Sequence, residues 1–183
     1  MTPDLDAWDA WEPPLVAARL AGVGVPWCVA GGWAIDLFLG ERTRPHDDLD
    51  LAVPAASFPA VAARFPDLEF HVAGDGQVEP VTPAALARHY QTWALDPAAG
   101  VWRFDVLREP SDGGVWVARR DARLRRPYGE LICFDRDGIP YLSPEVNLFF
   151  KAALGREKDR ADYERVEPLL TGAQRAWLDA ALS

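Results

Sequence analysis

Hydrophobic and polar positions follow one pattern over the first three quarters of the chain and another after it. Before residue 140, short apolar runs are separated by turn residues, which predicts strands and short helices. Leu49, Leu51 and Val53 alternate with polar or small residues, so a half-buried strand is expected over 49–53. The other expected strands are 25–30, 68–72, 90–95, 101–107, 115–118 and 130–134. Helices are expected over 15–21, 33–39 and 57–65, and the composition of 74–83 predicts turns.

The last quarter of the chain has the signals of consecutive helices. Ser143-Pro144-Glu145 combines an N-cap residue, a proline at the first helical position and an acid in the first turn. Helices are therefore predicted over 146–154, 159–170 and 174–182. We predict an α+β fold: a small mixed sheet with flanking helices in an α/β core (1–140), and a C-terminal helical segment (141–183) packed on it.

Composition limits the classes of partner. The chain has 183 residues, with 28 Asp and Glu against 19 Lys and Arg, a formal charge of −9. Such a surface repels nucleic acid and favours a cationic small molecule. Cys28 and Cys133 lie apart in apolar runs, which argues against a disulfide framework. With no basic leader and no apolar run of about 20 residues, we expect a cytoplasmic protein without membrane contact.

Candidate chemistry is concentrated in the segment 31–51, GGWAIDLFLGERTRPHDDLDL. Gly31 and Gly32 separate a strand from a helix, where a backbone can approach a phosphate closely. Asp48 and Asp50 share one face of the next strand, about 6–7 Å apart. At such a short distance, two carboxylates repel each other unless a cation lies between them, and Mg²⁺ is the usual cation. An exposed strand face with two solvated acids is the alternative.

A third acid, Asp105, lies in the strand predicted over 101–107. If that strand neighbours the strand of Asp48, three carboxylates converge as in two-metal phosphoryl or nucleotidyl transfer. Asp96 and Glu109 are alternative third acids. Asp105 is preferred because apolar neighbours on both sides place it in a strand.

The basic residues are distributed unevenly. The chain has 17 Arg but only two Lys, Lys151 and Lys158, both in the C-terminal quarter. Lysine is a compact point charge that arginine does not replace at a phosphate, so both are candidate triphosphate ligands. The alternative is a solvated helix face that makes pairs with Glu157 and Asp162. Gly155 lies between the lysines, and a helix break there would separate their faces.

Gly31-Gly32, Asp48-x-Asp50 and the later strand acid resemble the polymerase-β-like nucleotidyltransferase superfamily. GGWAID, LG, TR and HDDLDL resemble its antibiotic-modifying branch, the 2″-adenylylating aminoglycoside and the lincosamide nucleotidyltransferases. The strong resemblance covers about twenty residues, and a weaker one runs over 142–162. It implies that Gly31 and Gly32 lie against nucleotide phosphates. It further implies that Asp48, Asp50 and Asp105 are catalytic and bind Mg²⁺, with Asp105 a metal ligand or a general base.

Several other residues of this segment have two interpretations. Arg42, Arg44 and His46 either contact the triphosphate or neutralise the acids, and Arg44 is the one taken as a nucleotide ligand. Asp36 is expected to form structural contacts, and Asp47 is expected on the side opposite to Asp48. The basic run 119–126, RRDARLRR, is interpreted as a solvated edge or as a subunit or substrate contact.

The resemblance implies a Mg²⁺-dependent nucleotidyltransferase, with two ions expected. It would transfer a nucleoside monophosphate, AMP from ATP, to a hydroxyl of a small molecule. An aminoglycoside-like or lincosamide-like antibiotic is the expected acceptor, and the acidic surface suits a cationic amino sugar. The alternatives are a protein-modifying nucleotidyltransferase of a toxin–antitoxin pair and a nucleotide-binding module without catalysis. A monomer or a homodimer is expected.

Overall fold

The computed structural model describes residues 4–183. The strands are β1 (Cys28–Ala30), β2 (Asp50–Pro54), β3 (Glu69–Gly74), β4 (Gln77–Pro80), β5 (Gln91–Asp96), β6 (Val101–Glu109), β7 (Ser111–Asp112), β8 (Val115–Val117), β9 (Arg125–Pro127), β10 (Ile132–Phe134) and β11 (Pro140–Leu142). The α-helices are α1 (Pro13–Leu20), α2 (Gly31–Leu39), α3 (Phe58–Ala62), α4 (Pro83–Arg88), α5 (Tyr128–Leu131), α6 (Pro144–Ala152), α7 (Glu157–Val166) and α8 (Gly172–Leu182). Short 3₁₀ turns lie at Ala55–Ser57 and Glu167–Leu169.

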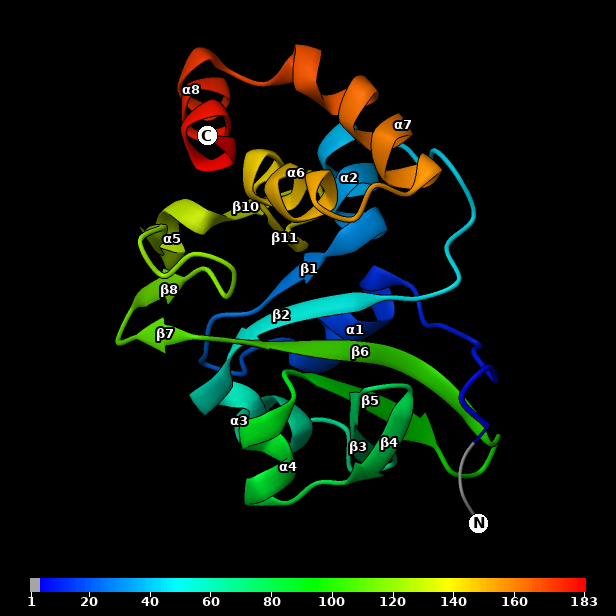
Figure 1. The fold of residues 1–183 in the computed structure, drawn as a ribbon. Helices are drawn as coiled ribbons and strands as arrows, with labels where there is room; N and C mark the ends of the chain where they lie inside the picture. The colour runs from blue at the N-terminus through cyan, green and yellow to red at the C-terminus, as the bar shows by residue number, and fades with distance from the viewer. Residues whose placement is uncertain (1–3) are drawn as a thin grey trace.

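Most of the strands form one mixed sheet, in the order β10-β11-β1-β2-β6-β5-β3-β4. β2 runs parallel to β6 and antiparallel to β1, and β7, β8 and β9 form a separate small sheet. Figure 1 shows α2 and the C-terminal helices α6, α7 and α8 on the side of the sheet that carries β1, β10 and β11, and α3 and α4 near β3, β4 and β5. The predicted α+β fold with a mixed sheet is confirmed.

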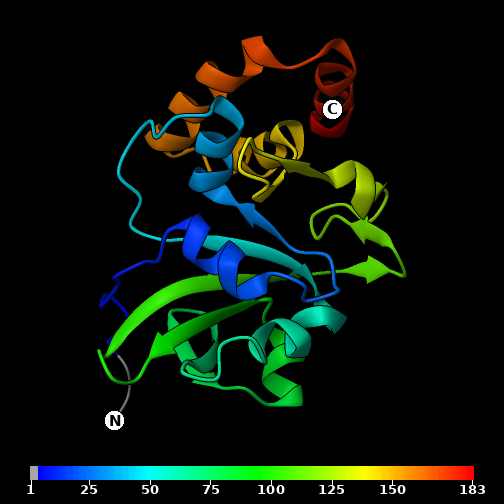
Figure 2. The same cartoon turned by 180° about the vertical axis from the view of Figure 1, so that it is seen from behind.

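The two faces of the sheet are covered differently. Leu49, Leu51 and Val53 are at most 1% exposed and belong to an apolar cluster with residues of α1 and α3. Figure 2 shows α1 in front of β2 and β6 on this face. On the other face, Cys28, Ala30 and Ala52 pack with residues of α6, α7 and α8. The period-2 alternation expected for 49–53 therefore separates two cores.

Two local predictions were wrong. The segment 74–83 contains β4, which forms a hairpin with β3, because Asp75 and Gly76 take positive φ angles of 53° and 72° between the paired Gly74 and Gln77. Asp-Gly is the expected sequence of such a two-residue turn. The strand expected over 130–134 begins as helix α5 and becomes β10 only at Ile132.

The C-terminal segment contains the predicted helices with shorter bounds. α6 ends at Ala152 and α7 starts at Glu157, and Gly155 between them has a φ of 66°. The break separates the elements that carry Lys151 and Lys158. The boundary expected at residue 140 falls inside β11. This strand pairs with β1 and β10 of the core sheet. The division of the chain into two parts remains a prediction. Within residues 4–183, each helix is too short or too polar to cross a bilayer.

Candidate active site

The centre of the sheet brings two of the predicted acids side by side. β2 and β6 pair in parallel with Asp50 opposite Asp105, and the Asp105 backbone N–H donates to the Leu49 carbonyl at 2.8 Å. Residues opposite each other on neighbouring strands present their side chains on the same face. Asp48 precedes β2 and is exposed. The three acids of the sequence prediction therefore lie at the start of β2 and at the adjacent position in the middle of β6.

The alternative third acids lie elsewhere. Asp96 ends β5, and its Oδ2 is 2.8 Å from Nη2 of Arg103. Glu109 lies at the far end of β6 and forms a buried ion pair with Arg119. Neither acid is opposite Asp50, so Asp105 is the acid that the register places beside it.

Asp105 is a buried carboxylate with two fixed hydrogen-bond donors. It is 3% exposed, and Gln91 Nε2 donates to its Oδ2 at 2.6 Å while the Thr92 backbone N–H donates to its Oδ1 at 3.1 Å. Burial raises the pKa of Asp105 to about 6, although these donors act in the opposite direction. A carboxylate with such a pKa is suited to accept a proton near neutral pH.

Asp50 experiences the strongest repulsion at the site. Burial and, after it, the charges of Asp48 and Asp105 together raise the pKa of Asp50 to about 8. Lys151 and Lys158 act in the opposite direction but do not compensate. The acids thus form a concentration of negative charge that a bound cation would stabilise.

The donor set fits Mg²⁺ in its chemistry. Mg²⁺ prefers oxygen ligands and is commonly bound by one or two carboxylates together with phosphate oxygens. Within residues 4–183, no three or more His, Cys, Asp or Glu side chains are gathered as a preformed metal site. Asp48 and Asp50 therefore offer carboxylate oxygens that nucleotide phosphates and water would complete.

Gly31 and Gly32 allow the start of α2 to approach the acids. Gly31 has a φ of 64°, and a Cβ placed on it would lie 2.2 Å from Oδ2 of Asp50. A Cβ on Gly32 would lie 2.4 Å from Nη2 of Arg44. Asn147 of α6, which sequence reasoning missed, holds Gly31: its Nδ2 donates to the Gly31 carbonyl at 2.8 Å and its Oδ1 accepts from the Gly31 N–H at 3.2 Å.

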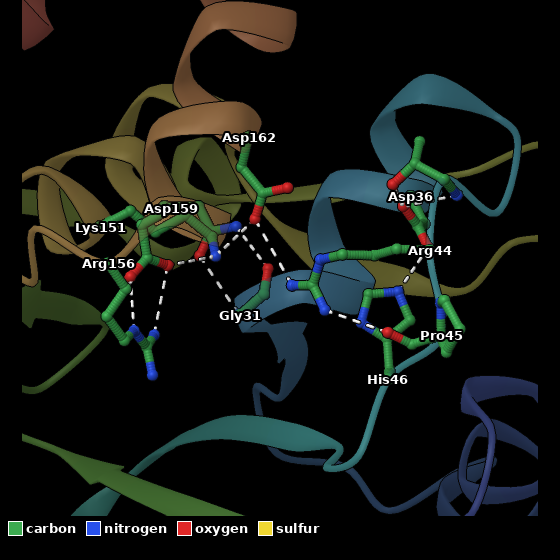
Figure 3. Close-up of polar contacts among 11 residues, drawn as sticks. Gly31, Asp36, Arg44, Pro45, His46, Lys151, Arg156, Asp159 and Asp162 are labelled. Atoms are coloured by element: carbon green, nitrogen blue, oxygen red, sulfur yellow. Dashed lines mark hydrogen bonds and ion pairs between the residues drawn. The ribbon is translucent and has the colours of Figure 1, made fainter.

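Lys151 is the centre of an ion-pair network between α6, α7 and the loop before β2 (Figure 3). It is 5% exposed, and its Nζ lies 3.1 Å from Asp159 Oδ1 and 2.8 Å from Asp162 Oδ2. Arg156 contacts Asp159 at 2.6 Å, and Arg44 lies 3.5 Å from Asp162. Lys151 is therefore buried rather than part of a solvated face. Lys158 is half-buried and has no ion pair with the residues of 4–183.

The loop before the acids is fixed mainly by structural contacts. Arg42 pairs with Glu12 at 2.9 Å. His46 Nε2 lies 2.5 Å from Oδ2 of Asp36, whose Oδ1 accepts from the Thr43 hydroxyl at 2.6 Å. Burial lowers the pKa of His46, and its bond to Asp36 opposes this effect. Of these side chains, Arg44 is the one that reaches the network of Lys151, and Asp36 has the structural role expected for it.

A cavity of about 240 Å³ joins the acids to the basic side chains. Gly31, Asp48, Asp50 and Lys151 line one part of it. The cavity is also lined by residues that sequence reasoning did not select for the site: Tyr90, Gln91, Trp116, Tyr128, Asn147 and Phe150. The basic run 119–126 also reaches this cavity through its first two arginines, and the guanidinium of Arg119 lies 3.8 Å from the ring centre of Tyr90.

The model of the family described as aminoglycoside-2''-adenylyltransferase matches residues 15–166. The chain belongs to this family. Family members described as 2''-aminoglycoside nucleotidyltransferases from Escherichia coli and Klebsiella pneumoniae are each 57% identical over 30 residues, 16% of this chain. The alignment spans only about one sixth of those relatives, 17% of their length.

Solved structures with this fold extend the comparison. The solution structure of the antibiotic-resistance factor ANT(2'')-Ia superposes with a TM-score of 0.61 at 18% identity, covering 91% of this chain and 86% of that one. The crystal structure of the lincosamide adenylyltransferase LnuA with lincomycin gives 0.60 at 17%, covering 88% and 99%. The complex of ANT(2'')-Ia with adenylyl-2"-tobramycin gives 0.56 at 18%, covering 92% and 95%. At these identities the structures establish a shared fold.

Proposed function

We propose that this protein is a Mg²⁺-dependent nucleotidyltransferase that transfers AMP from ATP to a hydroxyl of a small antibiotic-like acceptor. The observation that carries the proposal is the register of β2 and β6, which places Asp50 opposite Asp105 beside the Gly31 backbone. Family membership supports the reaction class, and the solved structures with the same fold include proteins named for aminoglycoside and lincosamide adenylylation.

The cationic side chains would bind the triphosphate. Lys151 and Arg156 line the cavity that also contains Asp48 and Asp50, while Lys158 adds its charge near Asp50. Gly31 and Gly32, lacking Cβ atoms, leave the start of α2 open to phosphate oxygens. Arg44 is held beside them by Asp162. These groups orient the α-phosphorus toward the acids.

Asp48 and Asp50 would hold the magnesium ions, which neutralise charge on the triphosphate and on the departing pyrophosphate when bound. Asp105 takes the proton of the acceptor hydroxyl, because its pKa is raised toward neutrality and Gln91 and Thr92 fix its orientation. The hydroxyl oxygen then forms a bond to the α-phosphorus, and the bond from that phosphorus to the oxygen of the β-phosphate breaks. Pyrophosphate leaves, and the proton is passed from Asp105 to solvent.

A direct assay tests this function. The purified protein is incubated with ATP, Mg²⁺ and a panel of acceptors that includes tobramycin and lincomycin, and pyrophosphate and the acceptor mass are measured. We expect pyrophosphate release together with an acceptor enlarged by one AMP. The Asp105→Asn variant, which keeps the size of the side chain, should release neither product. Transfer that persists in this variant would remove Asp105 from the mechanism, and ATP binding without transfer to any acceptor would contradict the function.

A further inference from the structure

The N-terminal arm, residues 4–12, precedes the part of the chain that matches the family. It lies along the start of β6: the Trp102 N–H donates to the Ala7 carbonyl at 2.8 Å, and the Asp9 N–H donates to the Trp102 carbonyl at 3.1 Å. β2 pairs with this same edge of β6, but only from Asp50 onward. The arm therefore extends the sheet immediately before the acids and is held there by backbone hydrogen bonds.

The arm lines one side of a second, open cavity, which we call the arm cavity, with a volume of about 640 Å³. Its walls include the indoles of Trp8 and Trp93 and four acids, Asp6, Asp9, Asp47 and Asp48. The two indoles meet edge to face with centres 5.0 Å apart, and Trp93 packs in the same way on the buried Trp102 at 5.3 Å. The aromatic wall is thus fixed by packing.

The charge of the arm cavity is largely uncompensated. Asp9 pairs with Arg103, but Asp6, Asp47 and Asp48 form no ion pair with any residue of 4–183. His46 also contributes to the wall; its side chain is 1% exposed, and its Nδ1 has no hydrogen-bond partner in the described chain. Indole faces beside free carboxylates bind cationic groups through both the π-system and the charge.

Asp48 lines both cavities, which places the arm cavity next to the proposed reaction centre. The first cavity contains Lys151, Arg119, Arg120 and Arg156 and is suited to the triphosphate. The arm cavity has the opposite charge. Trp93 also lies beside the third acid, because it is opposite Asp105 in the pairing of β5 with β6. A ligand that extends from the arm cavity past Asp48 would therefore approach the acids from the side of Trp93.

We propose that the arm cavity is the acceptor subsite and binds a protonated amino-sugar ring against Trp8 and Trp93, with its ammonium groups near Asp6 and Asp47. The proposal rests on the proposed function for the identity of the reaction, but the binding itself does not require ATP. It assigns part of the acceptor specificity to the arm, which lies outside the family match, and it predicts a preference for polycationic over weakly charged acceptors.

The test uses two variants of the full chain, Trp8→Ala and the double variant Asp6→Asn with Asp47→Asn, and tobramycin and lincomycin as probes. Binding of each probe is measured by calorimetry without ATP at two salt concentrations, and KM and kcat are measured for probe and ATP. Asp137→Asn, which removes one exposed acid of the β10–β11 turn, is the matched control. Thermal melts and the KM for ATP show whether each variant is folded.

For wild type we expect tobramycin binding that weakens as salt increases. Each arm variant should raise the KM and the dissociation constant for tobramycin about tenfold or more, with kcat and the KM for ATP within about twofold. Asp137→Asn should change none of these values. Unchanged tobramycin affinity in both arm variants would overturn the subsite, as would wild type that adenylylates lincomycin and does not bind tobramycin. Absence of transfer to every acceptor would instead contradict the proposed function, and the calorimetry would still decide the subsite.

Discussion

The acids on the sheet and the cations on the C-terminal helices face one cavity, but their charges are balanced differently. Burial raises the pKa of Asp50, and the charges of the neighbouring Asp48 and Asp105 act in the same direction. Lys151, in contrast, contacts both Asp159 and Asp162, and the side chains of all three are at most 6% exposed. Among residues 4–183 these acids form no ion pair, whereas Lys151 pairs with two carboxylates.

This difference in charge balance indicates that the acids and Lys151 have different roles. A set of like charges held by strand register is unfavourable alone and is stabilised by a ligand of opposite charge. A buried, paired lysine fixes the position of its own helix relative to the next one, because an uncompensated buried charge is costly. The acids are therefore arranged to gain from a bound cation, and Lys151 couples α6 to α7.

The largest expected effect is loss of transfer in Asp50→Asn. Removing this carboxylate should reduce pyrophosphate release about 10³-fold, or about 4 kcal/mol of transition-state stabilisation. The fold should be retained, because the substitution removes a repelled, desolvated charge. Thermal melts with and without Mg²⁺ provide the second measurement: Mg²⁺ should raise the Tm of wild type more than that of the variant. Equal rates of pyrophosphate release by wild type and Asp50→Asn would mean that the Asp50 carboxylate is not needed for the transfer reaction.

Lys151→Ala should have the largest effect on stability. It leaves Asp159 and Asp162 buried without their shared cation, which we expect to cost about 3 kcal/mol in the free energy of unfolding, measured with urea. Adding Asp159→Asn and Asp162→Asn to Lys151→Met should recover part of this loss, since no buried charge then remains unpaired. A loss below about 1 kcal/mol in Lys151→Ala would show that the network is not structural.

Gly31→Ala tests the close contact between the start of α2 and the carboxylate of Asp50. A Cβ at this position meets Oδ2 of Asp50, and the φ of 64° disfavours any side chain. We expect a loss of about 1–2 kcal/mol of stability, with a higher KM for ATP. Gly172→Ala is the matched control, because it has an ordinary φ and no atom within 4 Å of its added Cβ. Equal melting temperatures for the two variants would contradict the close approach at Gly31.

The smallest effect is expected for Lys158→Ala. This side chain is half-buried and has no ion pair with the residues of 4–183, so the change in unfolding free energy should stay within about 0.5 kcal/mol. The KM for ATP should rise several-fold, since a charge near the triphosphate is lost. If Lys158→Ala destabilised the protein as much as Lys151→Ala, the contrast between a paired and an unpaired lysine would be wrong.

The sequence was sufficient for elements whose signals are local. The alternation at Leu49, Leu51 and Val53 predicted the strand that separates the two cores, and Ser143-Pro144-Glu145 predicted the start of α6. β4 was missed although Asp75-Gly76 is a hairpin signal, because its own strand is short and half-exposed. The α5–β10 junction depends on packing against neighbouring strands, which a local pattern does not contain.

The sequence by itself determined the family resemblance, the acids Asp48 and Asp50 and the presence of a glycine pair before a helix. Only the tertiary structure decided which acid lies beside Asp50, because the register of β2 and β6 joins residues more than fifty positions apart. The partners of Lys151 also depended on how α6 and α7 pack across the break at Gly155. Strand register and helix packing arise from contacts distant in sequence, so the residue types were visible in the chain and their combination was not.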